Sequence, residues 1–395
     1  MDDLTSFGLD VLLVAAGLSA ALLASKLTAR LAVPSAAVFL VAAAVASDAV
    51  PSLAPSTNAV ERIGTIALIV ILFDGGSSIG LRRFRTVAVP VAAAGIVGTF
   101  ATAGLIATFA HWALDFGWTT SGLLGAAIAP TDPAVMFSIL GDRAIGGTVQ
   151  PLLEGESGAN DPVGIALMIG MIELATNHDA TFWVVVETFA LQMSIGLAFG
   201  IVGGLVERQL LRKLALPSSG LHTIRTLALA GLVYGAATVA HGSGFLAVFV
   251  AGLIVGDLEV AFKTEIDAFQ DGLATLAEIV VFVALGLTIS LGSLSGADWA
   301  EGFALAAFTA LVARPVALGP LLLPTSLRRG EVAFVMWGGL KGAVPILLAA
   351  FAVGRHVPDA HRLYDLVFVV VLVSVVVQGS SLSWAARRLG VTPRA

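Results

Sequence analysis

The sequence predicts an all-α polytopic membrane protein. Hydrophobic residues fill 57% of its 395 positions and charged residues only 12%, and the mean hydropathy is +0.96, whereas a soluble domain has about 25% charged residues. The 43 glycines suit helices that pack closely in lipid through small residues. The absence of cysteine excludes disulfides and thiolate metal sites, and the net charge of −6 argues against a nucleic-acid partner.

Thirteen apolar segments account for this hydropathy, since a membrane-spanning helix needs about 20 apolar residues. The first residues, 1–3, lack the basic start of a cleaved signal peptide, so we expect the first segment to remain as an anchor. A single transmembrane domain over 1–395 is expected, with no soluble regulatory domain. The segments run approximately over 7–25, 31–48, 60–79, 86–110, 119–141, 150–175, 182–206, 222–240, 243–258, 273–292, 302–323, 331–354 and 364–386.

The fifth and twelfth segments are interrupted near their centres. A Pro-Thr-Asp-Pro motif at 130–133 interrupts the fifth, because proline removes a backbone donor and restricts the residue before it. Residues 338–345 interrupt the twelfth with glycines and a proline. Numbered from each end, the segments form two six-helix halves, 1–175 and 222–388, joined by a linking helix at 182–206. Two inverted repeats with paired broken helices are a recurring plan of transporters.

The basic residues predict the orientation of the chain. An odd number of spans places the termini on opposite sides, and Lys and Arg concentrate in cytoplasmic loops. With the N-terminus outside, 16 of the 21 basic residues fall in inside loops and 3 in outside loops. We therefore expect a multi-pass protein of the cytoplasmic membrane, with its N-terminus outside and its C-terminus in the cytoplasm.

Five charged side chains lie at mid-depth in these segments: Asp132, Glu156, Asp161, Arg314 and Lys341. A charge at the bilayer centre costs a few kcal/mol or more and is functional by default, and buried charges must be paired or satisfied. Three acids against two bases leave one carboxylate uncompensated. Such a site holds one monovalent cation or one proton but not comfortably both, which is a mechanism for exchanging one for the other.

Charge balance suggests a role for four of these groups. Asp132 and Lys341 lie in the two interruptions, where they can neutralise the partial charges at half-helix ends. Asp132 has an equally good interpretation as a group that only bonds the opened backbone. Glu156 and Arg314 are expected to form a structural ion pair.

Asp161 is the carboxylate left over. Ser157 lies one helical turn away on the same face, and Asn160 is its neighbour in the chain. Oxygen ligands of this kind suit a hard alkali cation. Asp74, towards the cytoplasmic end of the third segment, is expected to line the entrance or else to bind the ion. Glu278 is interpreted as a satisfied polar residue near a helix end.

With these residues the sequence resembles the cation:proton antiporter-1 family, which includes the animal sodium/proton exchangers. Within that family it is most similar to the bacterial cell-volume-regulation type of potassium/proton antiporter. The resemblance covers almost the whole chain, and the Asn-Asp pair with an upstream Thr-Asp-Pro is its most specific signal. The matching motifs lie at residues 72–76, 130–133, 156–162, 313–315, 339–345 and 378–384.

The resemblance implies a homodimer in a lipid bilayer, each copy with a dimerisation part and a mobile core in which the two broken helices cross beside the ion site. It implies that Asp161 takes the cation and the proton alternately, with Ser157 and the Thr131 backbone as co-ligands. Asn160 in place of a second Asp is the feature associated with electroneutral exchange. Lys341 departs from the Arg of many relatives, which alters the hydrogen-bond geometry. No cofactor is implied beyond the transported Na⁺ or K⁺ and H⁺.

The sequence therefore predicts a secondary antiporter rather than an enzyme, exchanging Na⁺ or K⁺ for H⁺ one for one, with roles in pH homeostasis and cell volume regulation. Which alkali cation is preferred is left open. A cation channel is the alternative from another class, although the chain lacks a repeated carbonyl filter or a ring of acids. An intramembrane aspartyl protease would use Asp132 and Asp161 as two carboxylates sharing a proton, but Arg314 and Lys341 have no role in that chemistry.

Overall fold

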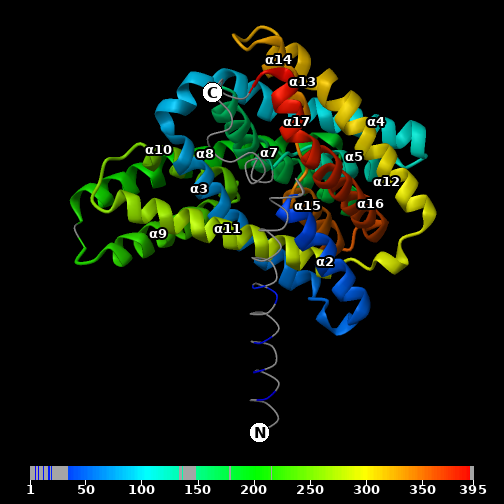
Figure 1. Cartoon of the computed structure of the whole chain (residues 1–395), viewed down its shortest axis with the longest axis horizontal. Coiled ribbons are helices and arrows are strands. Elements are labelled where there is room, and N and C mark those ends of the chain that lie inside the picture. The colour runs from blue at the N-terminus through cyan, green and yellow to red at the C-terminus, as the bar shows by residue number, and fades with distance from the viewer. Residues whose placement is uncertain are drawn as a thin grey trace.

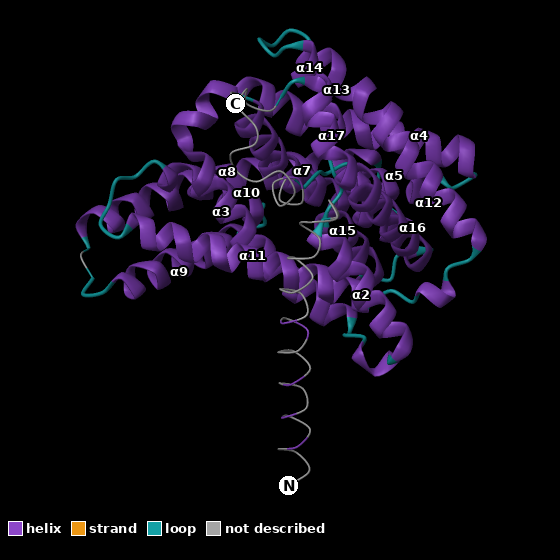
Figure 2. Ribbon diagram, viewed as in Figure 1, coloured by secondary structure: helices purple, strands orange, loops and turns teal. Residues whose placement is uncertain are grey.

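The computed structural model describes residues 34–132, 136, 148–177, 179–214 and 216–391, and five single positions before residue 34. Every element in these ranges is a helix, as the composition predicts (Figure 2). Up to residue 213 the helices are α2 (Ser35–Ala49), α3 (Thr57–Ala92), α4 (Thr99–Leu114), α5 (Trp118–Ile128), α7 (Val149–Thr176) and α8 (Phe182–Lys213), with a short 3₁₀ turn, Pro51–Leu53, and a π turn, Ala93–Gly98.

The second part of the chain contains shorter helices. They are α9 (Ser219–Val239), α10 (Gly244–Gly256), α11 (Lys263–Leu287), α12 (Gly296–Phe308), α13 (Arg314–Leu322), α14 (Arg329–Trp337), α15 (Ala343–Gly354), α16 (Ala360–Val373) and α17 (Ser380–Leu389). A 3₁₀ turn, Leu291–Ser293, precedes α12, and π turns join α12 to α13 and α16 to α17.

Five continuous helical stretches among the described residues are long and apolar enough to cross a membrane: Thr57–Leu114, Phe182–Lys213, Lys263–Leu287, Gly296–Leu322 and Ala360–Leu389. Shorter apolar helices are Ser35–Ala49, Gly244–Gly256 and Ala343–Gly354. The predicted span 7–25 lies outside the described residues except for single positions. The total of thirteen spans and the inverted repeat therefore remain predictions.

The stretch Thr57–Leu114 contains both predicted spans 60–79 and 86–110. They are separated at Gly80, whose φ of 68° breaks the helical path inside α3. Asp257 stabilises this kink, because its Oδ2 accepts a hydrogen bond of 2.6 Å from the Arg82 backbone nitrogen. A carboxylate at this position caps the helix that restarts after the glycine.

The helices form two groups with α7 between them (Figure 1). In one group α10 packs against α3 and α8, and α11 packs against α3 and α2. In the other group α16 packs against α12 and α15, and α4 against α5. Helix α7 contacts α3, α8 and α5, so the helix with the densest polar motif is buried at the centre. Glycines allow the close approach of α3 and α10, since a Cβ atom at Gly76 or Gly252 would collide with the backbone of the other helix.

The boundaries of some predicted spans differ from the structure, most clearly at α11. The span predicted at 273–292 corresponds to α11, which begins at Lys263 and ends at Leu287. The first turns of α11 are polar, with a salt bridge of 2.5 Å between Lys263 and Asp267, one turn apart. Hydropathy alone does not detect a helix that starts with polar residues, so the prediction began too late.

Candidate cation and proton site

The two interruptions contact each other directly. Helix α5 ends at Ile128, and the chain continues without helix to Asp132. The second interruption separates α14, which ends at Trp337, from α15, which begins at Ala343. The backbone nitrogen of Asp132 donates a hydrogen bond of 2.8 Å to Leu340 O in that second interruption. One backbone donor freed by the first interruption is therefore satisfied by a carbonyl of the second, as an apolar environment requires.

Lys341 lies at the carboxyl end of α5. Its buried Nζ donates to Ala129 O at 2.8 Å and to Pro130 O at 3.0 Å. These carbonyls belong to the end of a helix, where partial negative charge accumulates. The Lys341 backbone nitrogen donates to Ser374 Oγ at 2.9 Å, which ties the second interruption to the π turn after α16.

Asp132 lies at the N-terminus of a helix, whereas Lys341 lies at the carboxyl end of one. Its carboxylate packs so closely on Gly342 that a Cβ atom there would collide with it. Gly342 is the residue that precedes α15, so the carboxylate is placed at a helix N-terminus, where negative charge is favourable. The positions of Asp132 and Lys341 are those that the charge argument requires. Their functional roles remain predictions.

Glu156 and Arg314 form a two-pronged ion pair. Arg314 Nη1 donates to Glu156 Oε1 at 2.8 Å and Nη2 donates to Oε2 at 3.1 Å. The remaining guanidinium donors reach Met336 O and Val335 O at 3.0 and 3.1 Å, near the end of α14. The two residues are 1% and 3% exposed. The pair predicted from charge balance is therefore present, and it joins α7, α13 and α14.

Asn160, Ser157 and Thr131 form a hydrogen-bonded cluster between α7 and the first interruption. Asn160 Nδ2 donates to Thr131 Oγ1 at 2.8 Å, and the Thr131 backbone nitrogen donates to Asn160 Oδ1 at 3.3 Å. Ser157 Oγ donates to Thr131 O at 2.5 Å. The side-chain amide of Asn160 is thus used to hold Thr131 in place.

Asp161 completes this group and is different from its neighbours. It is 5% exposed, and its Oδ1 atom has no hydrogen-bond partner among the described residues. Asp132 and Lys341 are the charged groups that interact with it electrostatically. A buried carboxylate oxygen without a donor is costly. Binding a proton or a cation at this atom would remove that cost. Ser157 Oγ and Thr131 O are the nearby neutral oxygens that could share the cation.

Asp74 lies on α3 beside a polar contact to α11. Ser77 Oγ donates to Asp74 O at 3.0 Å and to Gln270 Oε1 at 3.3 Å. The charged groups that interact with Asp74 are the acids Asp271, Asp267 and Glu154 and one base, Lys263, which pairs with Asp267. An excess of acids attracts cations, which fits the interpretation of Asp74 as part of an entrance. The alternative that Asp74 binds the ion stays open.

The interpretation of Glu278 as a residue near a helix end is wrong. Helix α11 begins at Lys263 and continues to Leu287, so Glu278 lies well inside it. Its carboxyl group interacts electrostatically with Asp132 of the first interruption. The sequence held a signal for this, because Asp267, Asp271 and Glu278 recur at spacings of four and seven and so share a helix face.

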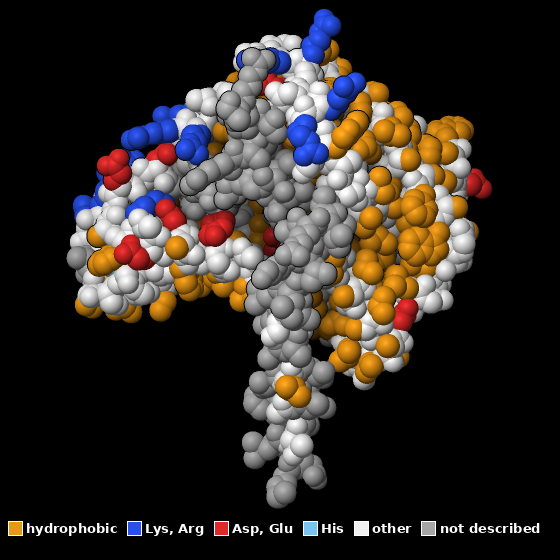
Figure 3. All heavy atoms as spheres, viewed as in Figure 1, with side chains coloured by type: hydrophobic (Ala, Val, Ile, Leu, Met, Phe, Trp, Pro, Cys, Tyr) orange, Lys and Arg blue, Asp and Glu red, His pale blue; other side chains and the backbone are white. Residues whose placement is uncertain are grey.

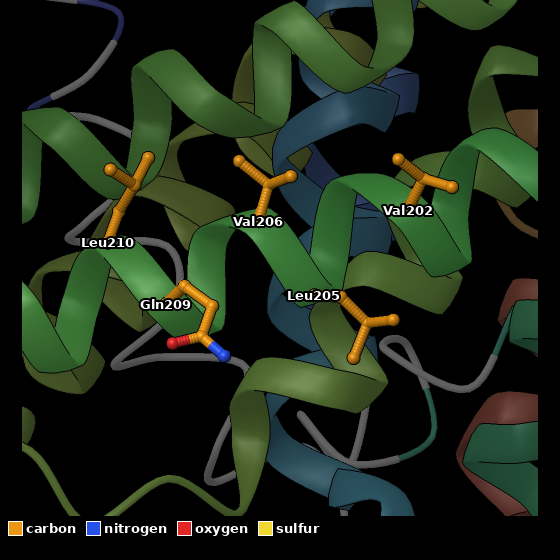
Figure 4. Close-up of a pocket in the computed structure, with 5 residues that line it drawn as sticks. All are labelled: Val202, Leu205, Val206, Gln209 and Leu210. Atoms are coloured by element: carbon orange, nitrogen blue, oxygen red, sulfur yellow. The ribbon is translucent and has the colours of Figure 1, made fainter.

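A groove of about 360 Å³ on α8 is separate from this cluster. Figure 4 shows Val202, Val206 and Leu210 along one line of the helix, with Leu205 and Gln209 on the adjacent side. The lining is apolar apart from one amide, so the groove offers no charged ligand to a cation.

The fold and the site define a class of protein: a helical membrane protein in which two interrupted helices meet beside a buried carboxylate. Residues 15–388 match the family model described as sodium/hydrogen exchanger, transmembrane. The chain belongs to this family, and the resemblance predicted from the motifs is confirmed.

The relatives that resemble this chain in sequence are antiporters, not enzymes. The chain is 38% identical over 329 residues to the K(+)/H(+) antiporter NhaP of Alkalimonas amylolytica, covering 83% of this chain and 57% of the relative. It is 34% identical over 393 residues to the K(+)/H(+) antiporter NhaP2 of Shewanella sp. (strain ANA-3), covering 98% of this chain and 67% of the relative. The chain thus spans between about half and two thirds of the length of these curated relatives.

A solved structure shares the fold. The sodium proton antiporter MjNhaP1 from Methanocaldococcus jannaschii superposes with a TM-score of 0.79 at 22% sequence identity, covering 95% of this chain and 99% of that one. At this identity the likeness establishes the fold alone.

Proposed function

We propose that this chain exchanges a monovalent alkali cation for a proton across the cytoplasmic membrane, with both ions competing for Asp161. The observation that carries the proposal is the buried Oδ1 of Asp161, which has no hydrogen-bond donor among the residues that the structure describes, on the helix that also carries Ser157 and Asn160, both bonded to Thr131. Membership of the sodium/hydrogen exchanger family and the names of the relatives support it.

The coupling follows from the cost of an uncompensated charge. Glu156 is neutralised by Arg314, and Asp132 and Lys341 each face a helix end of opposite partial charge. Of these charged groups around the interruptions, Asp161 is then the one whose Oδ1 has no hydrogen-bond partner in the described part of the chain. An empty, ionised Asp161 cannot cross an apolar barrier cheaply, so the site moves only with a cation or a proton bound. Exchange is therefore obligatory and one for one.

Asn160 supports electroneutral exchange in this proposal. Its side chain is a neutral amide that is bonded to Thr131 in both directions, as donor and as acceptor. It neither changes its charge nor leaves Thr131 easily. One titrating group at the site exchanges one charge for one charge, and the membrane potential then does not drive the cycle.

The orientation also belongs to the proposal. Figure 3 shows Lys and Arg side chains gathered along one edge of the molecule, above a wide apolar surface over α4 and α12. Exposed apolar side chains of these two helices include Trp112 on α4 and Phe303 on α12. We assign the basic edge to the cytoplasm and the apolar surface to lipid. A homodimer and the thirteen-span plan with two inverted repeats complete the assignment.

The test is exchange by purified protein in liposomes with an internal pH dye. Addition of Na⁺ or K⁺ should collapse an imposed pH gradient, and clamping the membrane potential should leave the rate unchanged. Potential-dependent cation flux without proton movement would instead select the channel. Titration with each cation identifies the preferred one.

Asp161→Asn should abolish the exchange, because an amide does not switch charge. Asp179→Asn, an exposed acid just after α7, is the matched control and should retain full activity. Exchange that survives Asp161→Asn would refute the assignment of the site.

A further inference from the structure

A second buried carboxylate lies outside the cation site. Helix α8 was expected to end at residue 206, but it continues to Lys213 and buries Glu207. Glu207 is 0% exposed, and neither of its carboxyl oxygens has a hydrogen-bond partner among the described residues. One turn before it, Gly204 packs against Ala251 and Ile254 of α10. An ionised carboxylate in such surroundings needs a partner.

The positively charged side chain near Glu207 forms its hydrogen bonds with other groups. Arg225 on α9 is the charged group that interacts with Glu207. Its Nη1 donates to Leu214 O at 2.7 Å, at the carboxyl end of α8, and its Nη2 lies 2.9 Å from His222 Nδ1. Its Nε is buried and has no hydrogen-bond partner among the described residues. One donor of this guanidinium is therefore free for another acceptor.

His222 is the other titratable group in contact with Arg225. A guanidinium only donates hydrogen bonds, so His222 Nδ1 accepts from Arg225. The ring Nε2 lies 3.1 Å from the backbone nitrogen and 3.2 Å from the backbone oxygen of Leu216, in the turn between α8 and α9. Two other charged groups of the neighbouring helix ends already have partners, since Lys263 pairs with Asp267 and Asp257 accepts from the Arg82 backbone nitrogen.

We propose that Glu207 is a proton-binding site separate from Asp161, and that Arg225 is its alternative partner. With the proton bound, Glu207 is neutral and Arg225 stays on Leu214 O and His222. Loss of the proton creates a buried charge that draws the guanidinium onto the carboxylate, where charge-assisted bonds are strong. The carboxyl end of α8 and His222 then lose their donor, and the turn between α8 and α9 rearranges.

A fluorescent probe on this turn tests the switch without any transport measurement. The chain has no cysteine, and a side chain at Gly220 in the first turn of α9 points into open space. Gly220→Cys can therefore carry a fluorophore whose own emission is insensitive to pH. Gly231→Cys, also open and further along α9, is the control position.

The probe at 220 should change its emission several-fold between acidic and alkaline pH, and the probe at 231 should not. Glu207→Gln should abolish the change at 220. Glu207→Leu, an apolar replacement, gives the same readout if the amide variant does not fold. A probe at 220 that does not respond to pH overturns the proposal, as does a response that persists in Glu207→Gln and disappears in His222→Gln.

The consequence for exchange rests on the proposed function. Glu207→Gln should change the pH profile of the exchange rate several-fold at one end and leave the cation KM unchanged, because Glu207 does not touch the cation site. If the parent protein shows no exchange at all, the proposed function fails while the probe response still decides the switch. A cation KM that shifts with Glu207→Gln would contradict a site separate from Asp161.

Discussion

Glu156 and Asp161 lie on the same helix, α7, five residues apart, and both are buried. The Glu156 carboxylate accepts two hydrogen bonds from the Arg314 guanidinium, whereas Asp161 Oδ1 has no donor among the described residues. The charge of Glu156 is compensated by a fixed side chain of the protein. A buried carboxylate oxygen without a donor is costly, which is why the proposed function assigns the exchanged ion to Asp161. The comparison thus contrasts a paired carboxylate with an incompletely paired one on one helix.

The surroundings of the two acids explain the difference. Glu156 faces α13, where Arg314 follows a π turn and is also held by the last carbonyls of α14. Asp161 faces the interruptions, where the local base, Lys341, already donates to the end of α5. The ammonium group of Lys341 is thus committed to the carbonyls at the end of α5, and the amide of Asn160 to Thr131.

The largest expected effect is a loss of stability when the ion pair of Glu156 and Arg314 is broken. Arg314→Ala leaves Glu156 buried without its partner, which typically costs about 3–5 kcal/mol. Melting temperature in detergent and expression should fall more than the exchange rate per folded molecule. Arg362→Ala removes a partly exposed pair with Glu301 and should cost no more than about 1 kcal/mol. Normal melting of Arg314→Ala with lost cation affinity would reverse the roles of the two acids.

A smaller loss is expected where the interruptions meet. Lys341→Met removes the donor to Ala129 O and Pro130 O, and a buried acceptor left unsatisfied costs about 1–3 kcal/mol. Thermal melting should show this loss. Lys341→Arg keeps the charge and should lose less stability. Wild-type stability of Lys341→Met would show that the opened end of α5 does not need this base.

The smallest effect is expected beside Asp161. Ser157→Ala removes the hydrogen bond to Thr131 O and a neutral oxygen, a change of about 1 kcal/mol, or about fivefold in the apparent KM for the cation. Ser121→Ala removes a buried hydroxyl on α5 that bonds to Phe116 O, away from the cluster, and should leave that KM unchanged. Equal shifts in both variants would exclude Ser157 as a ligand.

The buried charges are the part of the site that sequence predicts well. A membrane segment holds few charges and each must be satisfied, so counting them was enough to pair Glu156 with Arg314 and to place Lys341 at a helix end. The family motifs were equally informative, because the match covers residues 15–388.

Other features depend on packing that composition does not encode. The polar start of α11 concealed the depth of Glu278, and the polar end of α8 concealed the burial of Glu207. The hydrogen bonds between Asn160 and Thr131 link positions 29 residues apart, and which partner an amide chooses depends on the path of the interrupted chain. The first predicted span and most of residues 133–147 lie outside the described residues.

The most direct test of the central claim is proton release on cation binding by purified protein in weakly buffered solution. If the cation and the proton compete for Asp161, saturating Na⁺ or K⁺ should release about one proton per chain at a pH where the site is protonated, and raising the proton concentration should weaken cation binding in proportion. Asp161→Asn should release none, and Asp179→Asn should release as much as the parent. Cation binding without proton release, or release that persists in Asp161→Asn, would contradict the account.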